Sequence, residues 1–146
     1  MRPRGTGSTR VLVDEMTEAD VGDVCAISTA AFAGGPNVAG AMTEANVREE
    51  LGRPWARLWV ARDTSRQALG FVVLWHVVDE IHVLNVAVLP AFRRRGVGRV
   101  LVEHAVRYGA SRRIKHFLLE VRRSNAAAIA LYRCLGFYAM GLRRAY

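Results

Sequence analysis

The spacing of apolar residues along this chain distinguishes two kinds of element. Continuous apolar runs indicate strands, and apolar positions three and four apart indicate helices. Apolar runs rich in β-branched residues predict strands over 10–16, 58–62, 69–78, 81–88 and 116–121. Apolar positions spaced three and four apart predict helices after Thr17, over 44–51, after Gly96 and over 125–135. Taken in chain order, these strands and helices predict an α/β (α+β) domain, with helices on both faces of a mixed sheet.

Capping and turn residues mark the ends of these elements. Thr17 and Asp20 have the spacing of a capping box, and Thr43 can cap the helix that Gly52 and Pro54 terminate. Asp79-Glu80 is expected to turn one strand into the next. Pro90 ends the following strand because it lacks a backbone N–H, and Gly136 suits a helix C-cap.

Length and composition favour one globular domain. With 146 residues, 51% of them hydrophobic, the chain can bury a core, and we expect a basic flexible tail over 1–9 followed by a single domain over 10–146. No apolar run approaches the ~20 residues of a membrane span, and the first nine residues lack the apolar core of a secretory signal. A cytoplasmic protein is expected, with Cys25 and Cys134 as reduced, buried thiols rather than a disulfide.

The net charge of +8, with all but one of the 21 basic residues arginine, favours polyanionic partners such as nucleic acid, the ribosome or a phosphorylated cofactor. Stacked-aromatic RNA motifs and zinc-ligand spacings are absent from the sequence. Sequence-specific nucleic-acid binding and a metal site are therefore not expected, and His82 and His104 are interpreted as packed or surface groups.

The stretch from Leu84 to His104 carries the strongest chemical signal. An apolar strand enters a basic turn with two glycines, and an amphipathic helix follows at once. Glycines let successive N–H groups point into one concavity, and the helix start adds free donors and a positive dipole end, which together suit a pyrophosphate. Leu101 stands where a dinucleotide fingerprint needs its third glycine, and the Gly-Lys-Ser/Thr of a phosphate loop is missing.

The remaining pattern, Arg93-x-x-Gly96-x-Gly98, resembles the acetyl-CoA pyrophosphate loop of the GNAT N-acetyltransferases. A second stretch, Leu119 to Phe137, and the strand 84–88 are similar to the RimI type, whose members acetylate the N-terminal amine of a small-subunit ribosomal protein. The resemblance is close from about 79 to 146. It implies a mostly antiparallel GNAT sheet, acetyl-CoA as cosubstrate and direct transfer in a ternary complex.

Three side chains are candidates for the chemistry. Glu120 lies within an apolar strand, where a carboxylate either pairs with an arginine or serves as a base. Tyr132 lies on the inward stripe of the last helix, where it either packs in the core or protonates a leaving thiolate. The resemblance implies Glu120 as general base and Tyr132 as general acid. Asn125 can cap the last helix, and the resemblance adds a contact to the pantetheine arm.

The resemblance also implies that the strand Val86-Ala87-Val88 pairs with the pantetheine amides through its backbone, helped by a bulge near Asn85. The residues expected to hold the pyrophosphate are Arg93, Arg94, Arg95, Gly96, Val97, Gly98 and Arg99.

Two departures from the RimI pattern leave the acceptor open. The loop 33–40 has no tryptophan after Pro36, where RimI-like enzymes carry an aromatic–Pro–Trp segment. The chain also stops at Tyr146, where they continue into a final strand, so we expect a longer native protein. The favoured acceptor is a protein N-terminal amine, with a ribosomal alanine as candidate. Alternatives are lysine side chains, a small-molecule amine, or a non-catalytic CoA-binding module.

Overall fold

The computed structural model describes residues 10–32, 41–119 and 126–137. The tail 1–9, the loop 33–40 and the segment after Phe137 lie outside these ranges, as do the expectations that fall on them. The elements run in the order β1 (Leu12–Glu15), η1 (Glu18–Asp20), α1 (Val21–Phe32), α2 (Glu44–Leu51), β2 (Ala56–Arg62), β3 (Ala68–Val77), β4 (Glu80–Val88), η3 (Pro90–Phe92), α3 (Val97–Ser111), β5 (His116–Leu119) and α4 (Ala126–Cys134).

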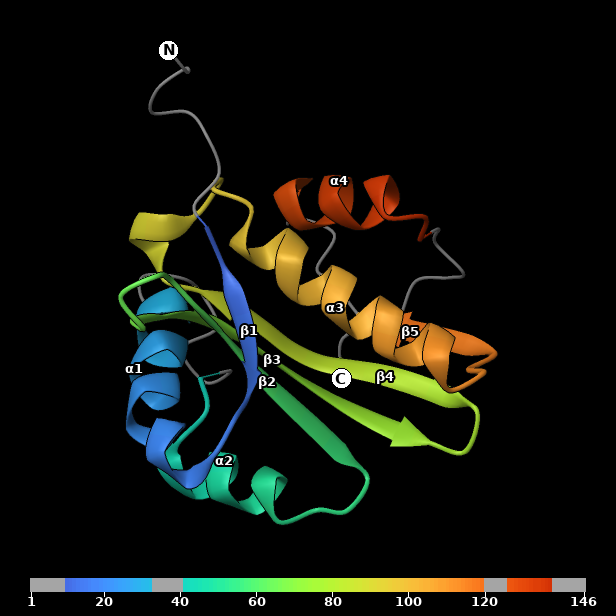
Figure 1. The fold of residues 1–146 in the computed structure, drawn as a ribbon, viewed down its shortest axis with the longest axis horizontal. Coiled ribbons are helices and arrows are strands. Elements are labelled where there is room, and N and C mark those ends of the chain that lie inside the picture. The colour runs from blue at the N-terminus through green and yellow to red at the C-terminus, as the bar shows by residue number, and fades with distance from the viewer. Residues whose placement is uncertain (1–9, 33–40, 120–125, 138–146) are drawn as a thin grey trace.

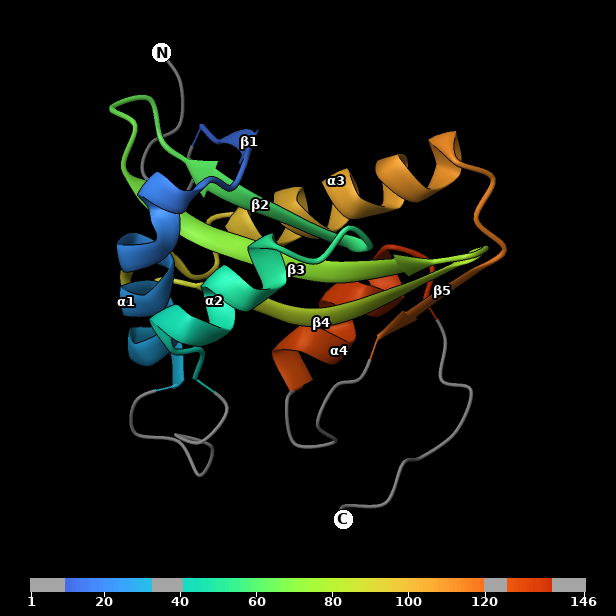
Figure 2. The same ribbon diagram turned by 90° about the horizontal axis from the view of Figure 1, so that it is seen from below.

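The strands form a sheet in the order β1-β2-β3-β4-β5. Strands β1 to β4 pair antiparallel, and β5 pairs with β4 in parallel. Helices α1 and α2 lie on one face and α3 on the other (Figures 1 and 2). The predicted mixed, mostly antiparallel sheet with helices on both faces is confirmed.

Alternating side chains of β3 build a core on each face of the sheet. Phe71 and Val73 point into a cluster with residues of α1 and α2, whereas Val72 and Leu74 point into a cluster with α3, and all four are essentially inaccessible to solvent. This strand reads as a continuous apolar run because both of its faces are covered.

Caps and turns follow the sequence prediction with one exception. The Thr17 and Thr43 capping boxes are both present. The turn between β3 and β4 is formed by Val78 and Asp79, one residue earlier than predicted, and Val78 has a positive φ of 56°. The prediction was wrong because turn propensity favours Asp over a β-branched residue in such a conformation.

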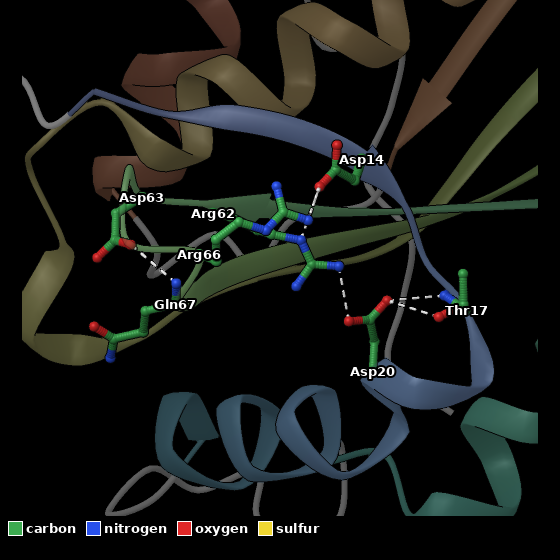
Figure 3. A network of polar contacts seen from close by, with 7 residues as sticks. All are labelled: Asp14, Thr17, Asp20, Arg62, Asp63, Arg66 and Gln67. Atoms are coloured by element: carbon green, nitrogen blue, oxygen red, sulfur yellow. Dashed lines mark hydrogen bonds and ion pairs between the residues drawn. The ribbon is translucent and has the colours of Figure 1, made fainter.

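A partly buried ion-pair network fixes the corner between β1 and α1 (Figure 3). The Arg62 guanidinium donates to Asp14 Oδ2 at 2.8 Å and to Asp20 Oδ1 at 2.8 Å, and Asp20 Oδ2 accepts the Thr17 backbone N–H at 2.9 Å. The hydrogen bond to Asp20 raises the pKa of Arg62. In the adjacent turn, the Gln67 backbone N–H bonds to the Asp63 carboxylate and lowers the pKa of Asp63. The start of α1 is thereby tied to β2.

Strand β5 is less covered than predicted. His116 is exposed and residues Phe117 to Leu119 are half-buried, and within the described ranges β5 is the last strand of the sheet. In the described part of the chain β5 pairs with β4 only. An apolar sequence does not by itself guarantee that both faces of a strand are covered.

No helix in the described ranges combines the length and the apolar character that crossing a membrane requires.

Candidate functional site

Strand β4 carries a bulge at the position that the family resemblance implied. Val73 lies opposite Asn85 and Leu74 lies opposite Val83, which leaves Leu84 as an extra residue on β4. A bulge of this kind bends its strand and interrupts the hydrogen-bond ladder. The predicted irregularity near Asn85 is confirmed.

The bulge coincides with the end of the pairing between β4 and β5. The last described pair is Val83 with Leu119, so in the described part of the chain the second half of β4 has a neighbour on the β3 side only. The Leu89 N–H bonds to Leu69 on the β3 side. The antiparallel alternation therefore turns the backbone groups of Val86 and Val88 toward the open side.

The side chains of Val86, Ala87 and Val88, the predicted pantetheine strand, pack in the two cores and do not face a ligand. Ala87 belongs to the core under α1 and α2, and Val86 and Val88 pack against the core under α3. What this segment can offer a ligand is its backbone, as an added extended segment would require.

Gly70 on β3 leaves room for the backbone of β4 to pass close by. This role for Gly70 was not predicted from the sequence. A Cβ on Gly70 would lie 2.6 Å from the Ala87 carbonyl oxygen and 3.3 Å from side chains of Val88 and Leu101. The isolated glycine inside the apolar run 69–78 was the available signal, since such glycines often mark a close backbone approach.

We predict that Gly70→Ala destabilises the protein by about 1–3 kcal/mol, because the added methyl group displaces β4. Thermal unfolding is the measurement. The matched control is Gly22→Ala, since nothing lies within 4 Å of that position in α1 and alanine is the better helix former. Equal unfolding temperatures for Gly70→Ala and the wild type would show that β4 moves to accommodate the methyl group without loss of stability.

The turn between η3 and α3 has the backbone form of an anion nest. Arg94 and Gly96 both have positive φ, 63° and 85°, and Gly96 is the N-cap of α3. The N–H groups in the first turn of a helix lack intrahelical partners. In α3 the first intrahelical hydrogen bond runs from the Val100 N–H to the Gly96 carbonyl. The Val97 side chain is buried, so its contribution to a ligand would be its N–H.

The four arginines of this turn differ in their contacts. Arg93 Nη2 donates to the Ala31 carbonyl at the end of α1 at 2.9 Å. The Arg95 guanidinium lies 5.5 Å from the Phe92 ring centre, and Arg99 pairs with Glu103 at 3.2 Å. For Arg94 no such partner exists within the described part of the chain, which leaves its charge available to an anion.

Helix α4 places Tyr132 on a rigid helix end. The Phe137 N–H bonds to the Tyr132 carbonyl and the Gly136 N–H to the Arg133 carbonyl, and Gly136 has φ 99°. This is the Schellman motif, in which the residue after the glycine packs on the helix. Accordingly, the ring centres of Tyr132 and Phe137 lie 6.0 Å apart in an edge-on arrangement. Burial raises the pKa of the Tyr132 phenol.

The first turn of α3 is where three of the predicted segments meet. A Cβ on Gly98 would lie 3.7 Å from Val88 at the end of β4 and 3.8 Å from Leu131, the neighbour of Tyr132 on α4. The open half of β4, the nest at Gly96 and the helix of Tyr132 are thus brought together. Glu120 and Asn125 lie outside the described residues; Glu120 follows β5 directly in the chain.

The histidines and cysteines have other surroundings. His82 Nε2 pairs with Glu80 at 2.9 Å, and His104 packs edge-on against Trp59, with its pKa lowered by burial and by Arg107. No group of three or more His, Cys, Asp or Glu suited to a metal ion occurs among the described residues. Cys134 is exposed and Cys25 is half-buried, so the prediction of buried thiols was wrong for Cys134 and holds only in part for Cys25. The apolar sequence neighbours of Cys134 lie on other sides of α4.

A hollow of about 380 Å³ lies elsewhere, between the second half of α3, β5 and the end of α4. Its lining is mostly apolar and contains none of the residues predicted to hold a cofactor. The hollow therefore adds nothing to the candidate site.

Comparison with known proteins identifies the family. The model of the acetyltransferase (GNAT) family matches residues 28–137. The chain belongs to this family. The GNAT fold is shared with the crystal structure of the ribosomal-protein-S18-alanine N-acetyltransferase from Escherichia coli, at a TM-score of 0.82 and 29% identity over 93% of this chain and 83% of that one.

One curated relative and one further solved structure complete the comparison. The [ribosomal protein bS18]-alanine N-acetyltransferase of Salmonella typhimurium is 49% identical over 76 residues, which is 52% of this chain and 51% of that protein. The chain thus spans about half the length of the curated relatives it matches. An N-acetyltransferase from Thermoplasma acidophilum, solved in complex with coenzyme A, shares the fold at a TM-score of 0.76 and 16% identity, covering 89% of this chain and 91% of that one.

Proposed function

We propose that this GNAT chain transfers the acetyl group of acetyl-CoA to the N-terminal α-amine of a protein, with the alanine of a small-subunit ribosomal protein as candidate acceptor. The observation that carries the proposal is the meeting of β4, the Gly96 nest and α4 at Gly98. The relatives named for bS18 alanine acetylation support the acceptor. An enzyme of that kind would work in the cytoplasm.

The cosubstrate would be held mainly by backbone. The N–H groups from Arg94 to Arg99 would bind the pyrophosphate, and the Arg94 guanidinium would add charge. The outward groups of Val86 and Val88 would pair with the pantetheine amides, with Asn125 as a further contact. This arrangement would leave the thioester near the bulge, where an N–H freed from the ladder could donate to its carbonyl oxygen.

The chemistry would need a base and an acid. Glu120 would take a proton from the acceptor ammonium, because only the free amine is nucleophilic. As the amine nitrogen bonds to the acetyl carbon and the carbon–sulfur bond breaks, the Tyr132 hydroxyl would give its proton to the sulfur. The second proton that the nitrogen loses as it becomes an amide would restore the Tyr132 phenol. Its raised pKa keeps the phenol protonated at neutral pH. The products are the acetylated N-terminus and CoA.

We predict that Glu120→Gln lowers kcat by roughly 10²–10⁴, the usual worth of a positioned proton-transfer group. The residual rate should rise with pH, because more of the acceptor amine is deprotonated without help. Steady-state rates from pH 6 to 10 are the measurement. A wild-type pH–rate profile in the variant would rule out Glu120 as the base.

The proposal is tested by acetyl transfer to a panel of short peptides. The panel holds peptides that begin with Ala, Ser or Met, an N-terminally blocked peptide with one lysine, and a polyamine. Turnover of the Ala-initiated peptide above all others is expected. Turnover confined to the lysine peptide or the polyamine would contradict the acceptor, and acetyl-CoA binding without turnover on any acceptor would indicate a non-catalytic module.

A further inference from the structure

Within the described residues, Arg93 is the one arginine of the Gly96 turn that is bonded to a distant part of the chain. Its Nη2 donates to the Ala31 carbonyl oxygen at 2.9 Å, across 62 positions of sequence. The contacts of Arg95 and Arg99 are local, with residues no more than four positions away. The bond from Arg93 therefore joins the turn that would bind a pyrophosphate to the end of α1.

The end of α1 supplies carbonyl groups but no cation of its own. Ala31 is the last residue but one of this helix, and the carbonyls of a last helical turn lack intrahelical partners. They form the negative end of the helix dipole, equivalent to about half an elementary charge. None of the 12 residues of α1 is basic. Arg93 thus provides, from another part of the chain, the cation that this helix end favours.

Apolar packing places this helix end on the end of β4. Ala31 and Leu89 both pack against the core cluster that contains Ala87, and Leu89 directly follows the last residue of β4. Figure 1 shows the end of α1 beside η3, the short helix that leads into the Gly96 turn. The guanidinium of Arg93 accordingly lies where α1, β4 and the turn come together.

The Gly96 turn has little else to hold its start. In the described part of the chain no backbone hydrogen bond engages the N–H groups from Arg94 to Arg99, and these free groups are what makes the turn suitable for an anion. The buried side chain of Val97 fixes the end of the turn in the core. The contact of Arg93 with α1 fixes its start.

The end of α1 would also act on a bound pyrophosphate through its charge. The carbonyl end of a helix is negative and repels an anion nearby, whereas a cation bonded to those carbonyls cancels the effect. Arg93 is in that position. Arg94 differs, because its guanidinium has no partner among the described residues and is available to the anion itself.

We propose that Arg93 is a positioning residue for acetyl-CoA and not a ligand of its pyrophosphate. It holds the start of the Gly96 turn against the end of α1 before the cosubstrate arrives, and it neutralises that helix end. A turn that is already ordered loses less entropy when it binds. The identity of the ligand rests on the proposed function, whereas the anchoring of the turn is a property of the free chain.

The anchoring is tested on the free chain by ¹⁵N relaxation. In the wild type the backbone order parameters of Arg94, Arg95 and Gly96 should be near 0.85, about the value of rigid backbone, and in Arg93→Gln they should fall below about 0.6. Two variants with the same loss of charge serve as controls. Arg94→Gln, in the turn itself, and Arg107→Gln, at an exposed position of α3, should leave the three values unchanged.

The effect on acetyl-CoA is tested by steady-state kinetics. Arg93→Gln should raise the KM for acetyl-CoA about three- to tenfold, the usual worth of one hydrogen bond, at an unchanged kcat, because binding is weakened without loss of transition-state contacts. The KM for S-acetylpantetheine, a thioester without the pyrophosphate, should stay at the wild-type value. Arg107→Gln should change neither constant.

Each contrary result has a distinct meaning. A raised KM for acetyl-CoA with a rigid turn in free Arg93→Gln would make Arg93 a phosphate ligand. An equal rise for S-acetylpantetheine would mean that the effect passes through β4, and an unchanged KM for acetyl-CoA would show that the turn functions without this anchor. A wild type that binds no acetyl-CoA would contradict the proposed function, and the order parameters would still decide whether Arg93 anchors the turn.

Discussion

Gly96→Asp is expected to weaken acetyl-CoA binding by more than about 100-fold, measured by calorimetry. Gly96 has φ 85° and ψ 3°, a left-handed conformation that costs an L-residue about 1–2 kcal/mol. The new carboxylate would also face the phosphates at a helix start that favours anions. The rest of the expected loss in binding free energy comes from lost charge-assisted hydrogen bonds to the phosphates, each worth about 1.5–3 kcal/mol.

The control for this variant is Gly96→Asn. Asparagine has nearly the same size and tolerates the left-handed region, and it adds no charge, so it should retain most of the affinity. Circular dichroism would verify that both variants are folded. Wild-type affinity in folded Gly96→Asp would mean that the nest does not hold the pyrophosphate.

Tyr132→Phe is expected to lower kcat by about 10²–10⁴, the range of a general acid, while acetyl-CoA affinity stays close to that of the wild type. Only the hydroxyl is removed, and the ring contact with Phe137 that anchors the helix end is kept. Because burial raises the phenol pKa above its ordinary value near 10, the wild-type rate should show no loss from phenol ionisation below that pH.

Cys134→Ser is the matched control on the same helix. The thiol is exposed two residues after Tyr132, and direct transfer needs no acyl-cysteine, so its kcat should be unchanged. A loss of activity in Cys134→Ser with full activity in Tyr132→Phe would replace direct transfer by a covalent route through the cysteine.

Much of the fold follows from local patterns. The two Thr caps, the helix 44–51 and the strand predicted over 69–78 depend on residues close in sequence, and the structure has them as predicted. The sequence did not indicate the turn at Val78, because its backbone conformation is unfavourable for valine. It also did not indicate the exposure of Cys134, because burial on α4 depends on which neighbours cover each side.

The candidate site divides in the same way. The glycine turn was predictable from residue types and spacing, and the bulge near Asn85 was implied by the resemblance to the GNAT enzymes. The close approach at Gly70 had one signal in the sequence, the isolated glycine in an apolar run, but how closely β4 passes depends on the packed sheet. The bond from Arg93 to Ala31 joins residues 62 positions apart, and no local pattern encodes such a contact. Glu120 and Asn125 remain predictions from sequence.

Hydrogen–deuterium exchange of the chain with saturating acetyl-CoA tests the proposed site most directly. We expect slower exchange at the outward amides of β4, Val86 and Val88, and at the amides from Arg94 to Arg99, with α1 and α2 unchanged. Protection confined to the hollow between α3, β5 and α4, or none at β4 and the Gly96 turn, would contradict it.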